Sequence, residues 1–215
     1  MADLYASALH LSRADIKALK MTDPYSLHRV VYSLFADQRS DTEKQGHTPS
    51  GIVYADQGGN FHGRKVLMLS DREPAPFVDE QFGQVVCKPI GREFLMHPQY
   101  RFKVQINPVR TDKRSGKRVP VKGRADIAAW FMARADRSWG FNVDPRTLQV
   151  DAVEVLQFKA KNERQITLAK AHIQGLLTVT DSEQFQQSFQ QGIGKGRAFG
   201  CGLLQVVPFI DHPFA

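Results

Sequence analysis

The two halves of the chain repeat one order of strand and helix patterns, and no other feature of the sequence constrains the fold as strongly. Asp23 suits a helix N-cap and Pro24 suits the first helical position, where its missing N–H is not needed. Apolar residues then recur at helical spacing up to Phe35, which predicts an amphipathic helix. Apolar and polar residues alternate over 99–107 until Pro108, which predicts a strand. We expect further strands at 5–11, 51–55, 65–70, 148–158, 165–179 and 203–207, helices at about 123–137 and from 180 or 181 to 191, and loops at 36–50, 110–118 and 159–164.

Each half therefore offers a strand, a helix, further strands and a closing strand. The most economical architecture is α+β, with two tandem ferredoxin-like (βαββαβ) domains. We expect the first domain over 1–110 and the second over 119–215, and 215 residues are enough for two small domains. The second helix of the first domain has the weakest support, because residues 75–91 show no clean period.

Composition excludes several classes of protein. A hydrophobic content of 42% with 24% charged residues is typical of a globular protein. No apolar run approaches the roughly 20 residues that cross a bilayer, and the N-terminus lacks the pattern of a signal peptide. Cys87 and Cys201 are far apart and in no CxxC spacing, so we expect neither a disulfide framework nor a zinc site. A cytoplasmic location is the default expectation.

The positive charge is concentrated in one segment. Residues 101–124 contain nine Lys or Arg and a single acid, Asp112, so they carry a net charge of +8 in a chain of net charge +7. Such a patch attracts polyanions and gains free energy when it releases their counterions. The charge alone is equally compatible with a solvated basic loop.

Glycine is dense between residues 192 and 202. Five glycines in this segment allow positive φ angles, and their N–H groups could form a concave anion site with Lys195 and Arg197. A P-loop is excluded because Gly196, not Ser or Thr, follows Lys195, and the dinucleotide pattern GxGxxG is absent. A tight connection between a helix and a strand, with no ligand, stays open as the alternative.

Several segments together resemble one known family. Residues 190–208, QQGIGKGRAFGCGLLQVVP, resemble the glycine-rich signature of CRISPR-associated RNA-processing proteins built on tandem ferredoxin-like domains. Residues 23–35, DPYSLHRVVYSLF, and residues 101–122, RFKVQINPVR…GKRVPVK, stand in the order found in the CasE family of type I-E systems. The resemblance covers most of the chain and is specific in the combination of the glycine signature with Tyr25 and His28.

The resemblance implies a metal-independent endoribonuclease without a cofactor. Members of the family bind the stem-loop of a CRISPR repeat in the precursor transcript and cut at the 3′ base of the stem. The upstream ribose 2′-OH is the nucleophile, and the products are a cyclic phosphate and a 5′-OH. The protein then stays on the hairpin as a subunit of the Cascade complex.

The resemblance also implies the site residues. His28 is the principal acid or base, and Tyr25, three residues earlier on the same side of the helix, is its partner. Tyr32 lies on that side too and is a weaker candidate. Without the resemblance, a lone helical histidine is more often an inert, partly exposed residue. The expected RNA contacts are Arg29, Lys117, Arg118, Lys122, Lys159, Lys161, Lys195, Gly194 and Gly196.

No metal site is expected, because the histidines form no HExxH or paired ligand spacing. Two other functions remain open at this point. One is a non-catalytic RNA-binding subunit of the same superfamily, which holds RNA without cutting it. The other is a general RNA-binding protein with no preference for repeat hairpins. The sequence assigns no role to the tail at 209–215 or to the loop at 36–50.

Overall fold

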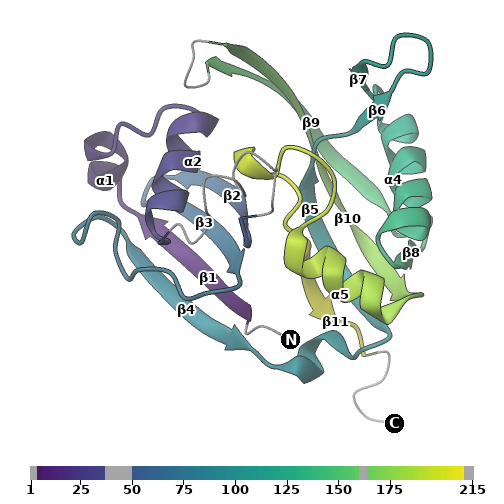
Figure 1. Cartoon of the computed structure of the whole chain (residues 1–215), viewed down its shortest axis with the longest axis horizontal. Coiled ribbons are helices and arrows are strands. Elements are labelled where there is room, and N and C mark those ends of the chain that lie inside the picture. Colours follow the sequence, from purple (N-terminus) through teal and green to yellow (C-terminus); the bar gives the residue numbers. More distant parts are fainter. Residues whose placement is uncertain (1–3, 37–49, 160–163, 211–215) are drawn as a thin grey trace. The chain divides into compact units, whose positions relative to one another are not determined.

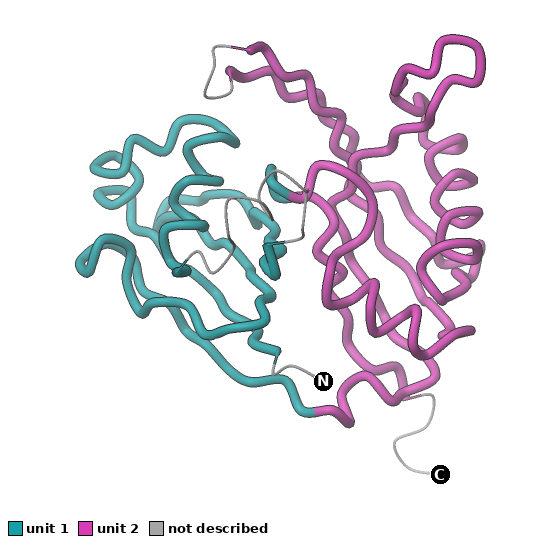
Figure 2. Tube along the Cα trace, in the orientation of Figure 1, with its two compact units in different colours: residues 1–91, 198–200 teal, residues 92–197, 201–215 magenta. Residues whose placement is uncertain are grey.

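The chain folds as two compact units. The computed structural model describes residues 4–36, 50–159 and 164–210. Unit 1 comprises Met1–Gly91 with Ala198–Gly200, and unit 2 comprises Arg92–Arg197 with Cys201–Ala215 (Figure 2). Most of the expected loop at 36–50, most of the turn at 159–164 and most of the tail at 209–215 lie outside the described residues.

Unit 1 is built on a four-stranded antiparallel sheet with the strand order β2-β3-β1-β4 (Figure 1). One face of the sheet is covered by α2, whose Leu27, Val30 and Val31 join a core with Leu9 and Tyr54. The elements are β1 (Leu4–Leu11), α1 (Arg13–Ala18), α2 (Pro24–Ser33), β2 (Ile52–Asn60), β3 (Gly63–Ser70) and β4 (Gln84–Ile90).

This strand order is that of a ferredoxin-like domain, but the described connection between β3 and β4 does not contain the second helix of the βαββαβ pattern. Residues 71–83 connect β3 to β4 without a helix. Pro74 and Pro76 lack the N–H that a helix interior requires, and Asp79 and Glu80 have positive φ angles of 48° and 62°. The short helix α1 is an addition that the sequence pattern did not predict. It is stabilised by a capping box between Ser12 and Asp15.

Unit 2 is a second ferredoxin-like domain, with the strand order β11-β5-β10-β8. β9 and β8 both pair with β10, at Gln165–Gln174 and at Leu177–Val179, so they act as one interrupted strand. The elements are a 3₁₀ turn (Arg92–Leu95), β5 (Gln99–Ile106), β6 (Val109–Thr111), β7 (Arg118–Pro120), α4 (Arg124–Ser138), β8 (Phe141–Val143), β9 (Gln149–Lys159), β10 (Gln165–Val179), α5 (Ser182–Gln191), a 3₁₀ turn (Arg197–Phe199) and β11 (Gln205–Pro208).

Aromatic side chains fill the core of unit 2 between the sheet and its two helices. Phe102 of β5 stacks on Phe131 of α4, with 5.6 Å between ring centroids and 8° between ring planes. Phe185 of α5 contacts Tyr100 at 5.3 Å and Phe141 at 6.1 Å. All five side chains are almost fully buried, which explains why the alternation in 99–107 was a reliable strand signal.

The two ferredoxin-like strand orders confirm the expected fold class. The expected boundary near residue 110 is wrong, because β5 pairs with β10 and β11 and therefore belongs to unit 2. The expected loop at 110–118 is present over residues 112–117, where it connects β6 and β7 of a short hairpin. Within the described part of the chain, no helix is long and apolar enough to cross a membrane.

Candidate functional site

Helix α2 presents Tyr25 and His28 on its first turns. Its N-cap Asp23 accepts a hydrogen bond from the Ser26 backbone N–H at 2.7 Å, and the Ser26 hydroxyl accepts one from the Asp23 N–H at 3.0 Å. This reciprocal cap fixes the start of the helix. Because Leu27 is buried in the core beside them, the half-buried Tyr25 and His28 lie on the flank of the apolar stripe, as the helical spacing predicts.

Three aromatic rings surround the imidazole of His28. Its ring centroid lies 4.2 Å from that of Tyr32, 6.3 Å from that of Tyr25 and 6.2 Å from that of Phe199. The Tyr32 hydroxyl is in turn within 2.8 Å of the Ser50 hydroxyl. Arg29 follows His28 on the same helix and is exposed. These contacts bring together an imidazole and two phenols, which are groups suited to proton transfer. The exposed guanidinium of Arg29 is a group suited to binding a phosphate.

Phe199 is the member of this cluster that the sequence did not reveal. It belongs to Ala198–Gly200, the part of the glycine segment that lies in unit 1. The buried Tyr54 of β2 donates its hydroxyl hydrogen to the Ala198 carbonyl at 2.7 Å. A Cβ at Gly200 would lie 3.2 Å from the Tyr54 ring, so the glycine permits the close approach. The one signal in the sequence that could have indicated Phe199 was its position as an aromatic residue inside a glycine-dense segment.

The rest of the glycine segment lies in unit 2 and is held by backbone hydrogen bonds, both within the segment and to β5. Ile193 donates its N–H to the Gly202 carbonyl at 2.9 Å, and Gly202 donates its N–H to the Gln105 carbonyl at 2.7 Å. Gly194 and Gly196 both have positive φ angles, 73° and 82°, and pack against Ile106 and Leu168. The packed connection left open by the sequence accounts for these two glycines, and their contact with RNA stays a prediction.

Lys195 and Cys201 of this segment differ sharply in how exposed their side chains are. Lys195 is exposed, and its backbone forms an isolated bridge with Asn107. Cys201 is fully buried, and this burial raises the pKa of its thiol to about 12. The thiol is therefore protonated at neutral pH and acts as a packing group rather than a nucleophile. Lys195 remains the candidate for a phosphate contact here.

The basic segment, residues 101–124, contains most of β5, the β6–β7 hairpin and the connection to α4. At the tip of the hairpin, the Asp112 carboxylate accepts hydrogen bonds from the Ser115 N–H at 2.9 Å and the Ser115 hydroxyl at 2.6 Å. The hydroxyl's hydrogen bond is the main reason that the pKa of Asp112 lies below its usual value. Lys117, Arg118 and Lys122 are all exposed, so their charges are available to a polyanion.

The expected site residues divide between the two units. Tyr25, His28 and Arg29 lie in unit 1. The expected contacts in unit 2 are Lys117, Arg118, Lys122, Lys159, Gly194, Lys195 and Gly196. Lys159 is exposed at the end of β9, whereas Lys161 lies outside the described residues. Across the described parts of the chain, no three His, Cys, Asp or Glu side chains gather to hold a metal ion, and metal independence stays a prediction.

Comparison with known proteins identifies the family. The family model described as CRISPR associated protein matches residues 4–208. The CRISPR-associated endoribonuclease Cse3 of Thermus thermophilus is 30% identical over 154 residues, which cover 66% of this chain and 72% of that protein. The Cascade subunit CasE of Escherichia coli is 23% identical over 213 residues, which cover 93% of this chain and 100% of that protein.

A solved structure agrees with these sequence relatives. The structure of Thermus thermophilus Cse3 bound to an RNA representing a pre-cleavage complex has a TM-score of 0.77 at 25% identity, covering 96% of this chain and 100% of that one. The likeness extends over both ferredoxin-like units, and so does the family match. The chain therefore belongs to the CRISPR associated protein family and, within it, to the CasE type.

Proposed function

We propose that this protein is an endoribonuclease that binds the stem-loops of CRISPR repeats in a precursor transcript and cuts at the 3′ base of each stem. It then remains on the hairpin as a subunit of the Cascade complex, in the cytoplasm where the transcript is made. The observation that carries the proposal is the match over residues 4–208 to a family whose relatives here are a CRISPR-associated endoribonuclease and a Cascade subunit.

The chemistry is an internal transesterification. The upstream ribose 2′-oxygen attacks the phosphorus while its proton passes to a base, and the bond from phosphorus to the 5′-oxygen breaks as that oxygen gains a proton. The products are a 2′,3′-cyclic phosphate and a 5′-OH. No redox change occurs, and the two proton transfers are the steps that side chains can accelerate.

His28 carries one of these proton transfers in our proposal, and Tyr25 is its partner. An imidazole suits this task because its unperturbed pKa of about 6.5 lies near the working pH. Support comes from the position of His28 on a capped helix, half exposed, with Tyr25 6.3 Å away between ring centroids. Arg29 is the cation assigned to the charge that develops on the phosphate. Lys195 is assigned separately to a phosphate contact of unit 2.

The test is cleavage of repeat RNA in EDTA with mapping of the product ends. We expect the wild-type protein to yield a cyclic phosphate and a 5′-OH in EDTA. His28→Ala should bind the hairpin with unchanged affinity and cleave it at least about 100-fold more slowly, which is the lower end of what general acid–base groups contribute.

His97→Ala is the matched control. His97 is also half buried and also lies against a tyrosine ring, Tyr100, at 6.0 Å. We expect this variant to cleave at the wild-type rate. A wild-type protein that binds the hairpin tightly but never cuts it would instead be a non-catalytic subunit. Equal binding to an unrelated stem of the same length would indicate a general RNA-binding protein.

A further inference from the structure

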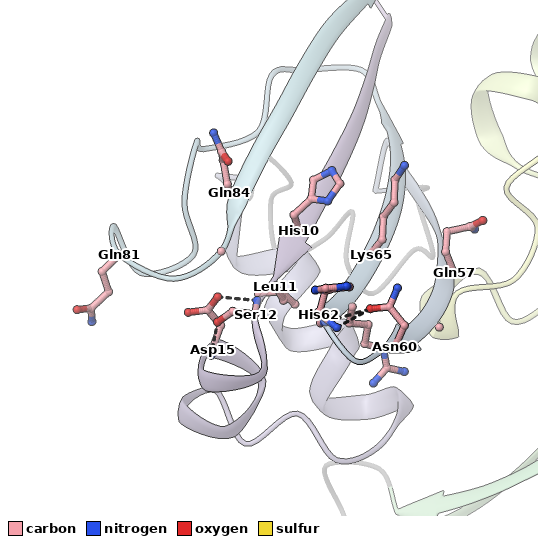
Figure 3. A pocket seen from close by; sticks show the side chains of 15 residues that line it. His10, Leu11, Ser12, Asp15, Gln57, Asn60, His62, Lys65, Gln81 and Gln84 are labelled. Atoms are coloured by element: carbon pink, nitrogen blue, oxygen red, sulfur yellow. Dashed lines mark hydrogen bonds between the residues drawn. The ribbon is translucent and has the colours of Figure 1, made fainter.

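The tip of the β2–β3 hairpin in unit 1 lies between two cavities that the cleavage mechanism does not use. The larger cavity has a volume of about 700 Å³, and Figure 3 shows His10, His62 and Lys65 among its lining residues. The smaller has a volume of about 540 Å³ and is lined by three cations of the α1 region, Arg13, Lys17 and Lys20. Both cavities share the hairpin residues Gly59, Asn60, Gly63 and Arg64.

Strand register brings polar side chains from three strands into one row. His10 of β1 is paired directly with Lys65 of β3 and with Gln84 of β4. Directly paired residues project from the same face of a sheet. Leu9 and Leu11, on either side of His10, are buried in the core, so the row of His10, Lys65 and Gln84 faces away from that core. All three side chains are exposed.

Two acidic groups near these cavities are already engaged. The Asp15 carboxylate accepts a hydrogen bond from the Ser12 N–H at 2.8 Å, and Asp56 forms an ion pair with Arg64. The Arg64 Nε also donates to Asp56 at 3.0 Å, and this hydrogen bond is the main reason that the pKa of Arg64 is raised. Among the described residues, no ion pair involves the cations that remain, which are Arg13, Lys17, Lys20 and Lys65.

An exposed aromatic ring stands at the tip of the same hairpin. Phe61 leaves 78% of its surface exposed, the largest value among the exposed large apolar residues that the structure describes. The Arg13 guanidinium lies 5.3 Å from the Phe61 ring centroid, and the His62 ring meets it edge-on at 5.6 Å. A flat ring beside a guanidinium provides a surface on which an unpaired nucleic-acid base can stack.

We propose that this tip surface, defined by Arg13, Lys17, Lys20, Phe61 and Lys65, binds the single-stranded RNA that flanks the repeat hairpin. One unpaired base stacks on Phe61, and the four cations contact the phosphates that follow it. The amides of Gln57 and Gln84, which line the larger cavity, supply hydrogen bonds to base edges. An acidic protein segment would also meet the four cations, but it would not account for the exposed Phe61 ring beside the Arg13 guanidinium.

This inference rests on the proposed function for the identity of the RNA. The test measures fluorescence anisotropy with three RNAs: the repeat hairpin alone, the hairpin with about twelve unpaired nucleotides on its 5′ side, and the hairpin with the same number on its 3′ side. A 2′-deoxynucleotide at the cleavage position keeps each RNA intact. We expect one flanked RNA to bind more tightly than the bare hairpin. Phe61→Ala should weaken that complex by about tenfold, the effect of losing one stacked base.

Phe77→Ala is the matched control, because Phe77 is another exposed phenylalanine of unit 1, at 42% exposure, and it lies between β3 and β4 rather than in the β2–β3 hairpin. We expect this variant to bind all three RNAs like the wild-type protein. Phe61→Ala should still bind the bare repeat hairpin normally and cleave an all-ribose copy of it at the wild-type rate, which shows that the variant is folded. A 4-thiouridine placed in the binding flank should cross-link to residues 13–20 or 57–65.

The proposal is overturned if Phe61→Ala binds both flanked RNAs as tightly as the wild-type protein does. It is also overturned if RNA binding is unchanged while assembly with other Cascade subunits is lost, because the surface would then serve a protein partner. Failure of the proposed function looks different, since the wild-type protein would leave the bare hairpin uncut. In that case an unstructured RNA without a hairpin still tests the tip surface.

Discussion

His28 has two tyrosine neighbours on α2, and their hydroxyl groups are in different situations. Tyr32 has the closer ring, at 4.2 Å between centroids, but its hydroxyl is hydrogen-bonded to Ser50. The Tyr25 ring is further away at 6.3 Å, and its hydroxyl has no hydrogen-bond partner among the described residues. The structure thus separates a tyrosine that packs against the imidazole from one whose hydroxyl can interact with substrate.

Removing each hydroxyl in turn should separate these two roles. We expect Tyr25→Phe to lower the single-turnover cleavage rate by about 10- to 100-fold, because the variant loses a group that assists proton transfer. Tyr32→Phe is the control and should lower the rate by less than about fivefold, since one hydrogen bond contributes about 1 kcal/mol. Quenched-flow cleavage of repeat RNA at saturating protein measures both. A slower Tyr32→Phe than Tyr25→Phe would reverse the assignment.

At the scale of elements, the glycine segment depends on close backbone approaches that a side chain would prevent. Gly202 has a φ of 89°, and a Cβ there would lie 2.3 Å from the Ile193 carbonyl oxygen. Ile193 also donates its N–H to the Gly202 carbonyl, so an added methyl group would separate a hydrogen-bonded pair. Gly116 at the tip of the β6–β7 hairpin has a similar positive φ of 66°, but no atom of the described residues lies within 4 Å of its Cβ position.

Comparing alanine substitutions at these two glycines isolates the effect of the steric clash between a Cβ at Gly202 and the Ile193 carbonyl oxygen. Gly116→Ala should destabilise the protein by about 1–2 kcal/mol, the cost of a left-handed backbone for an alanine. Gly202→Ala incurs that cost and the overpacking penalty of about 1–3 kcal/mol. It should therefore melt at a temperature several degrees below that of Gly116→Ala, given roughly 2–4 °C for each kcal/mol in a chain of this size. Equal melting temperatures would show that the segment relaxes around the added methyl group.

The elements that the sequence predicted correctly are those whose buried side chains recur at the period of a helix or a strand. The alternation in β5 and the cap of α2 predicted both elements to within one residue or two, because buried side chains follow the local period. β4 has the exposed pattern of an edge strand and showed no clean period. The boundary between the units was missed because pairing of β5 with β10 joins residues that are distant in the sequence, which no local pattern records.

At the scale of the whole molecule, cations that are dispersed along the sequence lie together on one surface of the folded chain. Counting along the sequence found the +8 of residues 101–124 and a remainder close to neutral. That count missed the tip surface, because the acids near it in the sequence, Asp15 and Asp56, are engaged in a helix cap and an ion pair. The assignment of catalysis to α2 comes from the resemblance and stays a prediction, since a single helical histidine has no distinctive period.

The basic hairpin should govern how the affinity for repeat RNA depends on salt. Lys117, Arg118 and Lys122 are exposed, and each phosphate that they bind releases counterions. Replacing all three with alanine should reduce the slope of log K against log salt by about 2 to 3, because each bound phosphate contributes roughly 0.7–0.9 to that slope. Cleavage at saturating protein should be unchanged, because our proposal assigns these side chains to binding the stem and not to proton transfer.

The matched control removes three cations from other exposed positions, Arg92, Arg134 and Arg137. Both triple variants lower the net charge of +7 by the same three charges, so a general attraction to RNA predicts the same change in slope for each. Local contacts of Lys117, Arg118 and Lys122 with phosphates predict that the slope changes only in the variant that lacks these three side chains. Filter binding between about 50 and 300 mM salt, with the His28→Ala background preventing cleavage, decides between the two. If the slopes fall equally, the hairpin holds no phosphates, and the stem must be bound by the remaining cations, Arg29 and Lys195 first among them.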